Sequence, residues 1–152
     1  MYVDASAIVA ILNREPGAEP FKSAFDANRA KAFVCPLTIF EATISLARAK
    51  VLARNKSQKP SGADIDAAYK VVRAFLEANS VKEVPVLADI GRLAIETAAT
   101  YGKAVGHPAD LNFGDCFVYA CAKAYRAPLL FKGDDFTKTD IPSVIVPLQL
   151  SR

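Results

Sequence analysis

Short apolar segments of strand length alternate along this chain with longer stretches whose apolar residues recur every three or four positions. The strand-like segments are residues 1–4, 32–35, 81–86, 129–131 and 143–146. The helix-like stretches are a run from residue 5 that ends near Pro16-Gly17, a short segment around Phe21 and Phe25, a long stretch from Thr38, and residues 65–76, 90–101 and 112–122. Because parallel strands are joined by helical crossovers, this alternation predicts an α/β fold with a mainly parallel sheet covered on both faces.

The length and composition of the chain predict one domain that spans residues 1–152. Of the 152 residues, 52% are hydrophobic and 23% are charged, which is enough to build one sizeable core. No apolar run reaches the length of a membrane-spanning helix, and the N-terminal residues lack the pattern of a secretory signal. We therefore expect a cytoplasmic protein with no membrane partner.

The cysteine and histidine inventory excludes several kinds of site. Cys35, Cys116 and Cys121 are odd in number and have no CxxC spacing, and His107 is the single histidine. A zinc finger or a disulfide framework therefore lacks ligands or partners, and buried reduced thiols are expected. The formal net charge is +3, which permits a polyanionic partner without requiring one.

Residues 38–79 are predicted to form a helical hairpin broken at Pro60-Ser61-Gly62. The expected apolar face of the first helix is Phe40, Ile44, Ala47 and Val51, and that of the second is Ile65, Ala68, Tyr69, Val72, Phe75 and Leu76. The first helix also carries a basic arm, which consists of Arg48, Lys50, Arg54, Lys56 and Lys59. This arm can contact phosphates, although a solvated helix face explains it equally well.

Four carboxylates lie where a parallel α/β chain would bring them together. Asp4 follows the first strand, Glu41 lies near a helix start, Asp115 lies in Asn112-Phe113-Gly114-Asp115, and Asp134 follows residues 129–131. Ligands of open α/β sheets collect outside the carboxyl ends of the strands, and clustered carboxylates repel one another unless a cation or protons neutralise them. The four positions together predict an acidic pocket for a divalent ion.

Each of the four acids also has a structural explanation when it is taken alone. Asp4 can cap the following helix, and Glu41 has the capping-box spacing with Thr38. Asp115 suits the positive end of a helix dipole, and the pair Asp134-Asp135 suits a turn. The prediction of a metal pocket therefore depends on all four acids meeting.

Oxygen ligands without histidine or thiolate favour Mg²⁺ or Mn²⁺, which assist phosphodiester hydrolysis by lowering the pKa of bound water and stabilising the leaving oxygen. Other kinds of catalysis lack the motifs or side chains that they require. Neither GxGxxG nor GxxxxGK[ST] occurs, and a serine or cysteine hydrolase would need His107 as its base, with Ser6 or Cys116 within reach. We expect a metal-dependent hydrolase of a polyanion.

Several segments resemble a known family. They are Tyr2-Val3-Asp4-Ala5-Ser6-Ala7, Phe40-Glu41, the stretch from Leu111 to Ala120 with its Asn-Phe-Gly-Asp-Cys motif, and residues 130–136 with Gly-Asp-Asp-Phe. Together they resemble a PIN-domain ribonuclease of the VapC toxin type, and the likeness covers nearly the whole chain in order and spacing.

The resemblance implies a three-layer α/β/α sandwich, RNA cleavage that depends on Mg²⁺ or Mn²⁺, and a toxin that forms a homodimer and is neutralised by a small cognate antitoxin. It places Asp4, Glu41 and Asp115 at the family's acidic positions, with Asp134 or its neighbour Asp135 as the fourth. Ser6 matches a polar position that supports the site.

On this basis we expect Asp4 and Asp115 to hold the principal ion, with Glu41 and Asp134 completing the pocket, and cleavage to leave a 5′-phosphate and a 3′-hydroxyl. The hairpin of residues 38–79 is expected to contact the dimer partner and the antitoxin through a groove for an amphipathic helix, with core packing as the competing explanation.

The alternative is a protein of another class. It is a non-catalytic α/β interaction module, for example a receiver-like domain in which Asp4 or Asp134 binds a divalent ion and Lys132 assists. Acetyl-phosphate labelling without RNA cleavage would favour that alternative.

Overall fold

Four short parallel strands form the centre of the molecule. The computed structural model describes residues 1–55 and 58–145. The strands are β1 (Tyr2–Val3), β2 (Phe33–Val34), β3 (Lys82–Glu83) and β4 (Leu129–Leu130), in the order β3-β2-β1-β4. All pairs are parallel, and Tyr2 faces Phe33 on one side and Leu129 on the other. The predicted parallel sheet is therefore confirmed.

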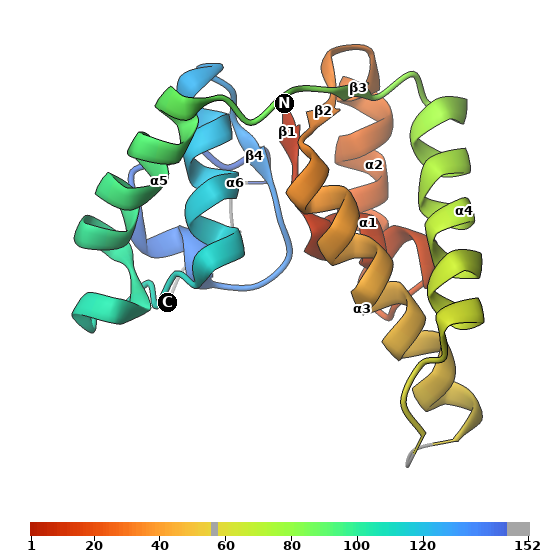
Figure 1. Cartoon of the computed structure of the whole chain (residues 1–152). Helices are drawn as coiled ribbons and strands as arrows, with labels where there is room; N and C mark the ends of the chain where they lie inside the picture. The colour runs from red at the N-terminus through yellow and green to blue at the C-terminus, as the bar shows by residue number, and fades with distance from the viewer. Residues whose placement is uncertain (56–57, 146–152) are drawn as a thin grey trace, which may run out of the picture.

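Six α-helices of the described chain cover the two faces of this sheet (Figure 1). They are α1 (Ala5–Leu12), α2 (Glu19–Asn28), α3 (Pro36–Arg54), α4 (Gly62–Ala78), α5 (Ala88–Tyr101) and α6 (Phe113–Ala124). Three short 3-10 helices, η1 (Arg29–Lys31), η2 (Lys103–Val105) and η3 (Asp135–Lys138), lie in the connections. In Figure 1 helices α1 to α4 lie on one side of β1, and α5 and α6 lie on the other.

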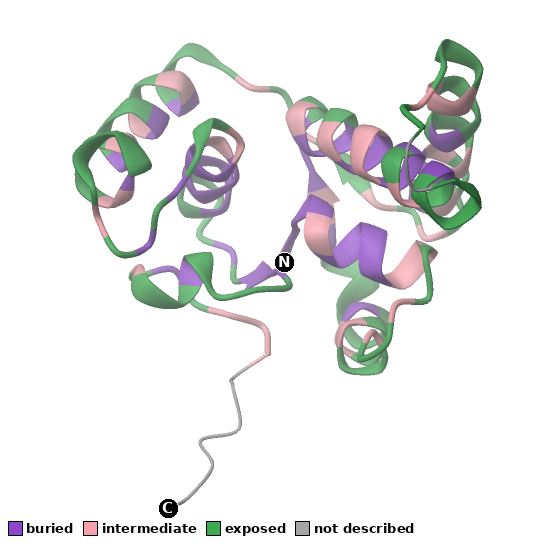
Figure 2. Cartoon of the chain, turned by 90° about the horizontal axis from the view of Figure 1, so that it is seen from below, coloured by how far each residue is buried: buried purple, intermediate pink, exposed green. Residues whose placement is uncertain are grey.

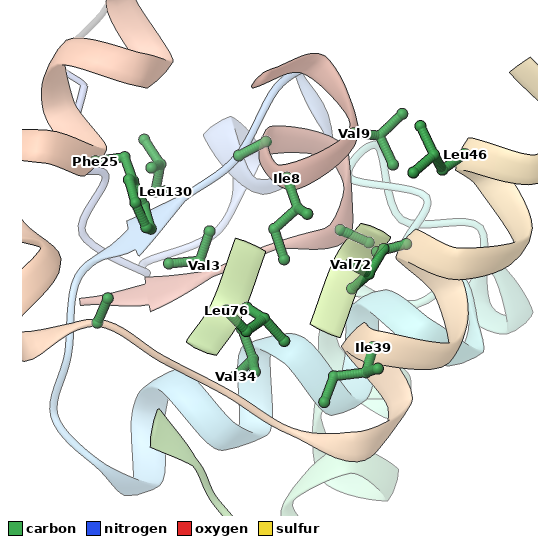
Figure 3. Packing of buried hydrophobic residues seen from close by; sticks show 14 of the residues in the cluster. Val3, Ile8, Val9, Phe25, Val34, Ile39, Leu46, Val72, Leu76 and Leu130 are labelled. Atoms are coloured by element: carbon green, nitrogen blue, oxygen red, sulfur yellow. The ribbon is translucent and has the colours of Figure 1, made fainter. Parts of the chain in front are cut away.

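Two apolar cores follow from the alternation of side chains along the strands. Val3 and Leu130 point into the core beneath α1 to α4, whereas Tyr2 and Leu129 point into the core beneath α5 and α6. Figure 3 shows the first core, in which Ile8 and other residues of α1 to α4 surround the strand residues. Buried residues line the inner sides of the helices while their outer sides are exposed (Figure 2). The three-layer α/β/α arrangement is confirmed.

The predicted helical hairpin is present, but its first helix differs from the prediction in two ways. It begins at Pro36 rather than Thr38, because proline at the first helical position already has the required φ and lacks an amide that would need a partner. Its exposed face includes Phe40, which is 67% exposed, and Ile44 is only half-buried. Ile39, Leu46 and other residues pack against α4 and the sheet instead.

The remaining boundaries mostly match the sequence predictions. Helix α1 ends at Leu12, before the predicted Pro16-Gly17, and Tyr69 of α4 is 46% exposed rather than buried. Next to β4, Ser143 forms an isolated parallel bridge with Leu129, where a fifth strand was expected. Val146, the last residue of that expected strand, and Lys56 of the basic arm lie outside the described residues.

Two further features of the fold concern the cysteines and the apolar character of the helices. Cys35, Cys116 and Cys121 are buried and unbridged, as the reduced-thiol interpretation requires. Within residues 1–55 and 58–145, none of the helices combines the length and the apolar character that crossing a bilayer demands.

Candidate metal centre

An acidic pocket of about 350 Å³ lies where the chain leaves the carboxyl ends of β1 and β4. The described residues that line it are Asp4, Ala5, Ser6, Val9, Glu15, Glu41, Ser45, Asn112, Asp115, Lys132, Asp135 and Phe136. They come from α1, α3, α6, η3 and the loops beside them. Larger hollows elsewhere on the surface are mostly apolar, whereas this pocket brings together three of the four acids named from the sequence, Asp4, Glu41 and Asp115.

Asp4 is both a helix cap and a member of the pocket. One of its oxygens, Oδ2, accepts the Ser6 amide at 2.9 Å and the Ser6 hydroxyl, so it caps α1. Burial raises the pKa of Asp4, the Ser6 hydrogen bonds oppose that rise, and the charge of Asp135 adds to it. Asp4 is 6% exposed as a residue, so its charge depends on something other than bulk water for stabilisation.

Glu41 lies inside α3 rather than in a capping box. The expected return bond to Thr38 is absent from the described hydrogen bonds, because Thr38 is interior and its hydroxyl lies 2.6 Å from the Tyr2 phenol oxygen. Burial, followed by the charges of Asp4 and Asp115, raises the pKa of Glu41 to about 7. The structural explanation by capping is therefore wrong for Glu41.

Gly114 makes room for the Glu41 carboxylate. A Cβ built at Gly114 would lie 2.9 Å from Oε2 of Glu41 and 3.3 Å from Oδ1 of Asn112. Any other residue at position 114 would push Glu41 or Asn112 out of place. The glycine in the Asn-Phe-Gly-Asp motif thus lets the first turn of α6 approach α3 closely.

Asp115 is anchored by a capping box at the start of α6. Its Oδ2 accepts the Asn112 amide at 2.9 Å, and its own amide donates to Oδ1 of Asn112 at 3.1 Å. Burial raises the pKa of Asp115 to about 6; the bond from the Asn112 amide opposes this rise, whereas the charges of Asp4 and Asp135 contribute to it. The hydrogen bond fixes the carboxylate at the positive end of the helix. Burial raises its pKa by more than the hydrogen bond lowers it.

The fourth acid on the pocket is Asp135 rather than Asp134. Asp135 lines the pocket, and its charge raises the pKa of both Asp4 and Asp115. Asp134 precedes η3, its backbone carbonyl accepts the Thr137 amide at 3.0 Å, and it is not among the described lining residues. Phe136 holds this turn by packing on Phe131, with ring centroids 5.1 Å apart.

Two charged residues of the pocket were not predicted from the sequence as part of the metal site. Glu15 follows α1 in a turn beside Pro16-Gly17, and no motif pointed to it. Lys132 was considered only for the receiver-like alternative.

The single histidine lies apart from the pocket: Nδ1 of His107 accepts the Ala109 amide at 3.0 Å, and its ring packs against Tyr101. His107 is therefore a loop residue and not a base of this site.

The donors of the pocket fit a hard divalent cation. They are carboxylate oxygens, and none of the ion pairs formed by residues 1–55 and 58–145 involves Asp4, Glu41, Asp115 or Asp135. Burial and mutual repulsion raise the pKa values of three of these acids, which a cation would reverse. Within the same ranges no group of three or more histidine, cysteine, aspartate or glutamate side chains is arranged closely enough to hold a metal ion. A site with one or two carboxylate ligands still suits Mg²⁺, which keeps several of its waters.

Comparisons with known proteins give a consistent result. Residues 1–142 match the PIN domain family. A VapC ribonuclease of Rhizobium meliloti is 42% identical over 140 residues, which are 92% of this chain and 98% of that protein. A VapC ribonuclease of Mycobacterium bovis is 37% identical over 147 residues, 97% of this chain and all of that protein. A ribonuclease VapC of Mycolicibacterium smegmatis is 35% identical over 144 residues, 95% of this chain and 99% of that protein.

Proposed function

The chain belongs to the PIN-domain family, and from that premise we propose that it is an endoribonuclease that hydrolyses RNA with Mg²⁺ or Mn²⁺ as the toxin of a toxin–antitoxin pair. One observation carries the proposal. Asp4, Glu41, Asp115 and Asp135, which come from separate parts of the chain, line one pocket, and the first three have raised pKa values. The family match leaves the receiver-like alternative without support.

The four acids divide the work of holding the ion. Asp4 and Asp115 are the principal ligands, because hydrogen bonds from Ser6 and Asn112 hold each carboxylate in a fixed position at the pocket. Glu41 and Asp135 complete the set directly or through water, and Asp134 remains the alternative to Asp135. A bound Mg²⁺ or Mn²⁺ supplies Lewis-acid stabilisation of the phosphodiester and lowers the pKa of water.

The chain's own residues then determine how the reaction proceeds. The carboxylates of the pocket must be ionised to bind the cation, so protons compete with the metal at this site. Burial and the charges of Asp4 and Asp115 raise the pKa of Glu41 to about 7, a value suited to taking a proton from the attacking water. Hydrolysis by this route leaves a 5′-phosphate and a 3′-hydroxyl.

The groove between α3 and α4 is the proposed seat of the cognate antitoxin. It has a volume of about 510 Å³, and Phe40 and Tyr69, two of its lining residues, are largely exposed. Thr43 also lines it, and its hydroxyl is the one buried side-chain oxygen of the described residues that lacks a hydrogen-bond partner. An amphipathic helix whose apolar side chains contact Phe40 and Tyr69 would fit this groove. The same hairpin is proposed to contribute to a homodimer.

The basic arm is the proposed contact for RNA or antitoxin outside the pocket. Arg48, Lys50 and Lys59 are exposed, whereas Arg54 forms an ion pair with Asp64 at 2.6 Å. Replacing Arg48 and Arg54 with glutamate should weaken binding of RNA or antitoxin and leave the fold intact. Unchanged binding of both would remove the basic arm from the proposal.

The decisive experiment combines cells and purified protein. RNA ends are sequenced after brief induction of the protein and compared with induction of an Asp115→Asn variant, and the cut RNA is then incubated with purified protein and Mn²⁺. We expect new 5′-phosphate ends only with the wild-type chain, and slower growth only in its cells. No new ends and no cleavage in vitro would refute the nuclease.

A further inference from the structure

Among the described residues, one positively charged side chain lines the acidic pocket, and it is already paired with a carboxylate. Among the described residues that line the pocket, Lys132 is the single basic side chain, against five carboxylates. Its Nζ donates to Oε2 of Glu15, the fifth of those carboxylates. A polyanionic substrate that enters this pocket meets net negative charge everywhere except at Lys132.

Lys132 is also linked to Asp4, one of the proposed metal ligands, through the Ser6 hydroxyl. Its backbone amide donates to the Ser6 hydroxyl at 2.9 Å, and that hydroxyl donates to Oδ2 of Asp4. The position of the lysine backbone is therefore set by the same hydrogen bonds that orient Asp4. A phosphate held by Nζ would lie beside the metal-binding carboxylates and not at a remote part of the surface.

Glu15 is held in place by its own turn. Its amide donates to the Ala10 carbonyl at 3.0 Å, and its carbonyl accepts the Ala18 amide at 3.0 Å. The preceding residue, Arg14, has a φ of 49°, which turns the chain sharply after α1. The ion pair thus joins two segments that are 117 residues apart in the sequence.

The ion pair is weak enough to be exchanged. The Lys132 side chain is 41% exposed and that of Glu15 is 25% exposed. Pairs between partly exposed charges contribute little to stability because water and salt screen them. A phosphate oxygen can therefore take the lysine from Glu15 without disturbing the fold.

Resting on the function proposed above, we propose that Lys132 binds the RNA phosphate adjacent to the scissile bond and that Glu15 competes with RNA for this lysine. Glu15 thereby lowers the affinity of the pocket for RNA. It also keeps an unpaired lysine from neutralising the carboxylates that must bind the cation. Lys132 acts on substrate binding, and Glu15 acts through Lys132.

The test uses a short RNA that spans a cut identified in cells, with steady-state cleavage measured at several salt concentrations. Lys132→Gln should raise KM about tenfold, the loss expected for one charge-assisted hydrogen bond, and leave kcat nearly unchanged. It should also reduce the slope of log KM against log salt by about 1. Lys138→Gln is the matched control, because Lys138 donates to the Pro108 carbonyl and does not line the pocket.

Glu15→Gln should lower KM about threefold, the size expected when an exposed ion pair is removed. Glu19→Gln removes the same charge from the start of α2 and should have no such effect. In the Lys132→Gln background the effect of Glu15→Gln should disappear. If it persists in full, Glu15 acts through the overall pocket charge and the competition is refuted.

The outcomes separate this inference from the proposed function. If Lys132→Gln and Lys138→Gln behave alike, or if Lys132→Gln lowers kcat at constant KM, the phosphate-binding role of Lys132 is wrong while the nuclease stands. If the wild-type chain cuts no RNA at all, the proposed function fails first and this inference fails with it. Melting temperatures of all variants establish that the effects are not caused by unfolding.

Discussion

Replacing Glu41 with glutamine should stabilise the metal-free protein at pH 8 while it removes activity. Glu41 lies among Asp4 and Asp115, and its pKa is raised to about 7 by burial and by their charges. Above that pH the folded state carries a carboxylate that would be better solvated in the unfolded chain. Glutamine has the same shape and no charge, so the substitution removes the repulsion but also a metal ligand.

The magnitude follows from the size of the pKa shift. The pKa of Glu41 rises from 4.5 to about 7, and that shift corresponds to ~3.4 kcal/mol at 1.36 kcal/mol per unit. Because Glu41 is only partly buried, solvent screening reduces the expected gain to roughly half, ~1.7 kcal/mol. A gain of that size is a sizeable part of the stability of a small domain.

The pH dependence has a definite sign. Below the unfolded pKa of 4.5 both states are protonated and Glu41 causes no penalty. Between that value and about 7, folding takes up a proton, so the wild-type protein loses stability as the pH rises, and above about 7 the penalty is complete. The advantage of Glu41→Gln should therefore be about 1.7 kcal/mol at pH 8 and below about 0.5 kcal/mol at pH 5.

Urea unfolding in the presence of a chelator measures this difference. The control is Glu96→Gln, which removes a carboxylate from the exposed side of α5 and should change stability by less than about 0.5 kcal/mol at either pH. Adding Mg²⁺ or Mn²⁺ should stabilise the wild-type chain more than Glu41→Gln, because the ion binds only the folded state. Equal stability of variant and wild type at pH 8, or an equal gain at pH 5, would refute the account of repelling carboxylates.

Three further predictions concern the same site and its support. Gly114→Ala should lower kcat/KM more than about tenfold by displacing Glu41, with a melting temperature close to wild type. Normal cleavage would contradict the 2.9 Å approach between a Cβ at position 114 and Oε2 of Glu41. The cleavage rate should rise with pH through about 6 to 7 as Asp115 and Glu41 lose protons, and higher Mn²⁺ should move this rise to lower pH; a flat profile would contradict it. Tyr2→Phe should cost about 1 to 2 kcal/mol in urea unfolding, because the phenol bonds the buried Cys35 and Thr38; an unchanged midpoint would contradict it.

The order of the secondary-structure elements could be predicted from the sequence because its signals are local. Alternating apolar segments marked β1, β2, β3 and β4, and the helical periodicity between them marked the helices. The Asn112 cap of α6 was also readable, since capping involves residues three apart. The start of α3 was predicted wrongly because two local signals compete there. The capping-box spacing of Thr38 and Glu41 favours a start at Thr38, but proline at the first helical position starts the helix at Pro36.

The exposed and buried faces of α3 were less predictable. The period of a helix fixes which residues share a face, but not which face meets the sheet. Phe40 was assigned to the buried face and is instead exposed at the groove beside α4. Packing against α4 and the strands decides this, and those neighbours come from other parts of the chain.

The sequence by itself determined that acids would gather at the carboxyl ends of parallel strands, because strand direction and connection length leave few other arrangements. Only the tertiary structure decided which acids face the pocket. Asp134 and Asp135 are equivalent neighbours in the sequence, and the turn into η3 directs Asp135 to the pocket. It also decided the pairing of Glu15 with Lys132, since contacts between distant segments depend on how the whole chain packs.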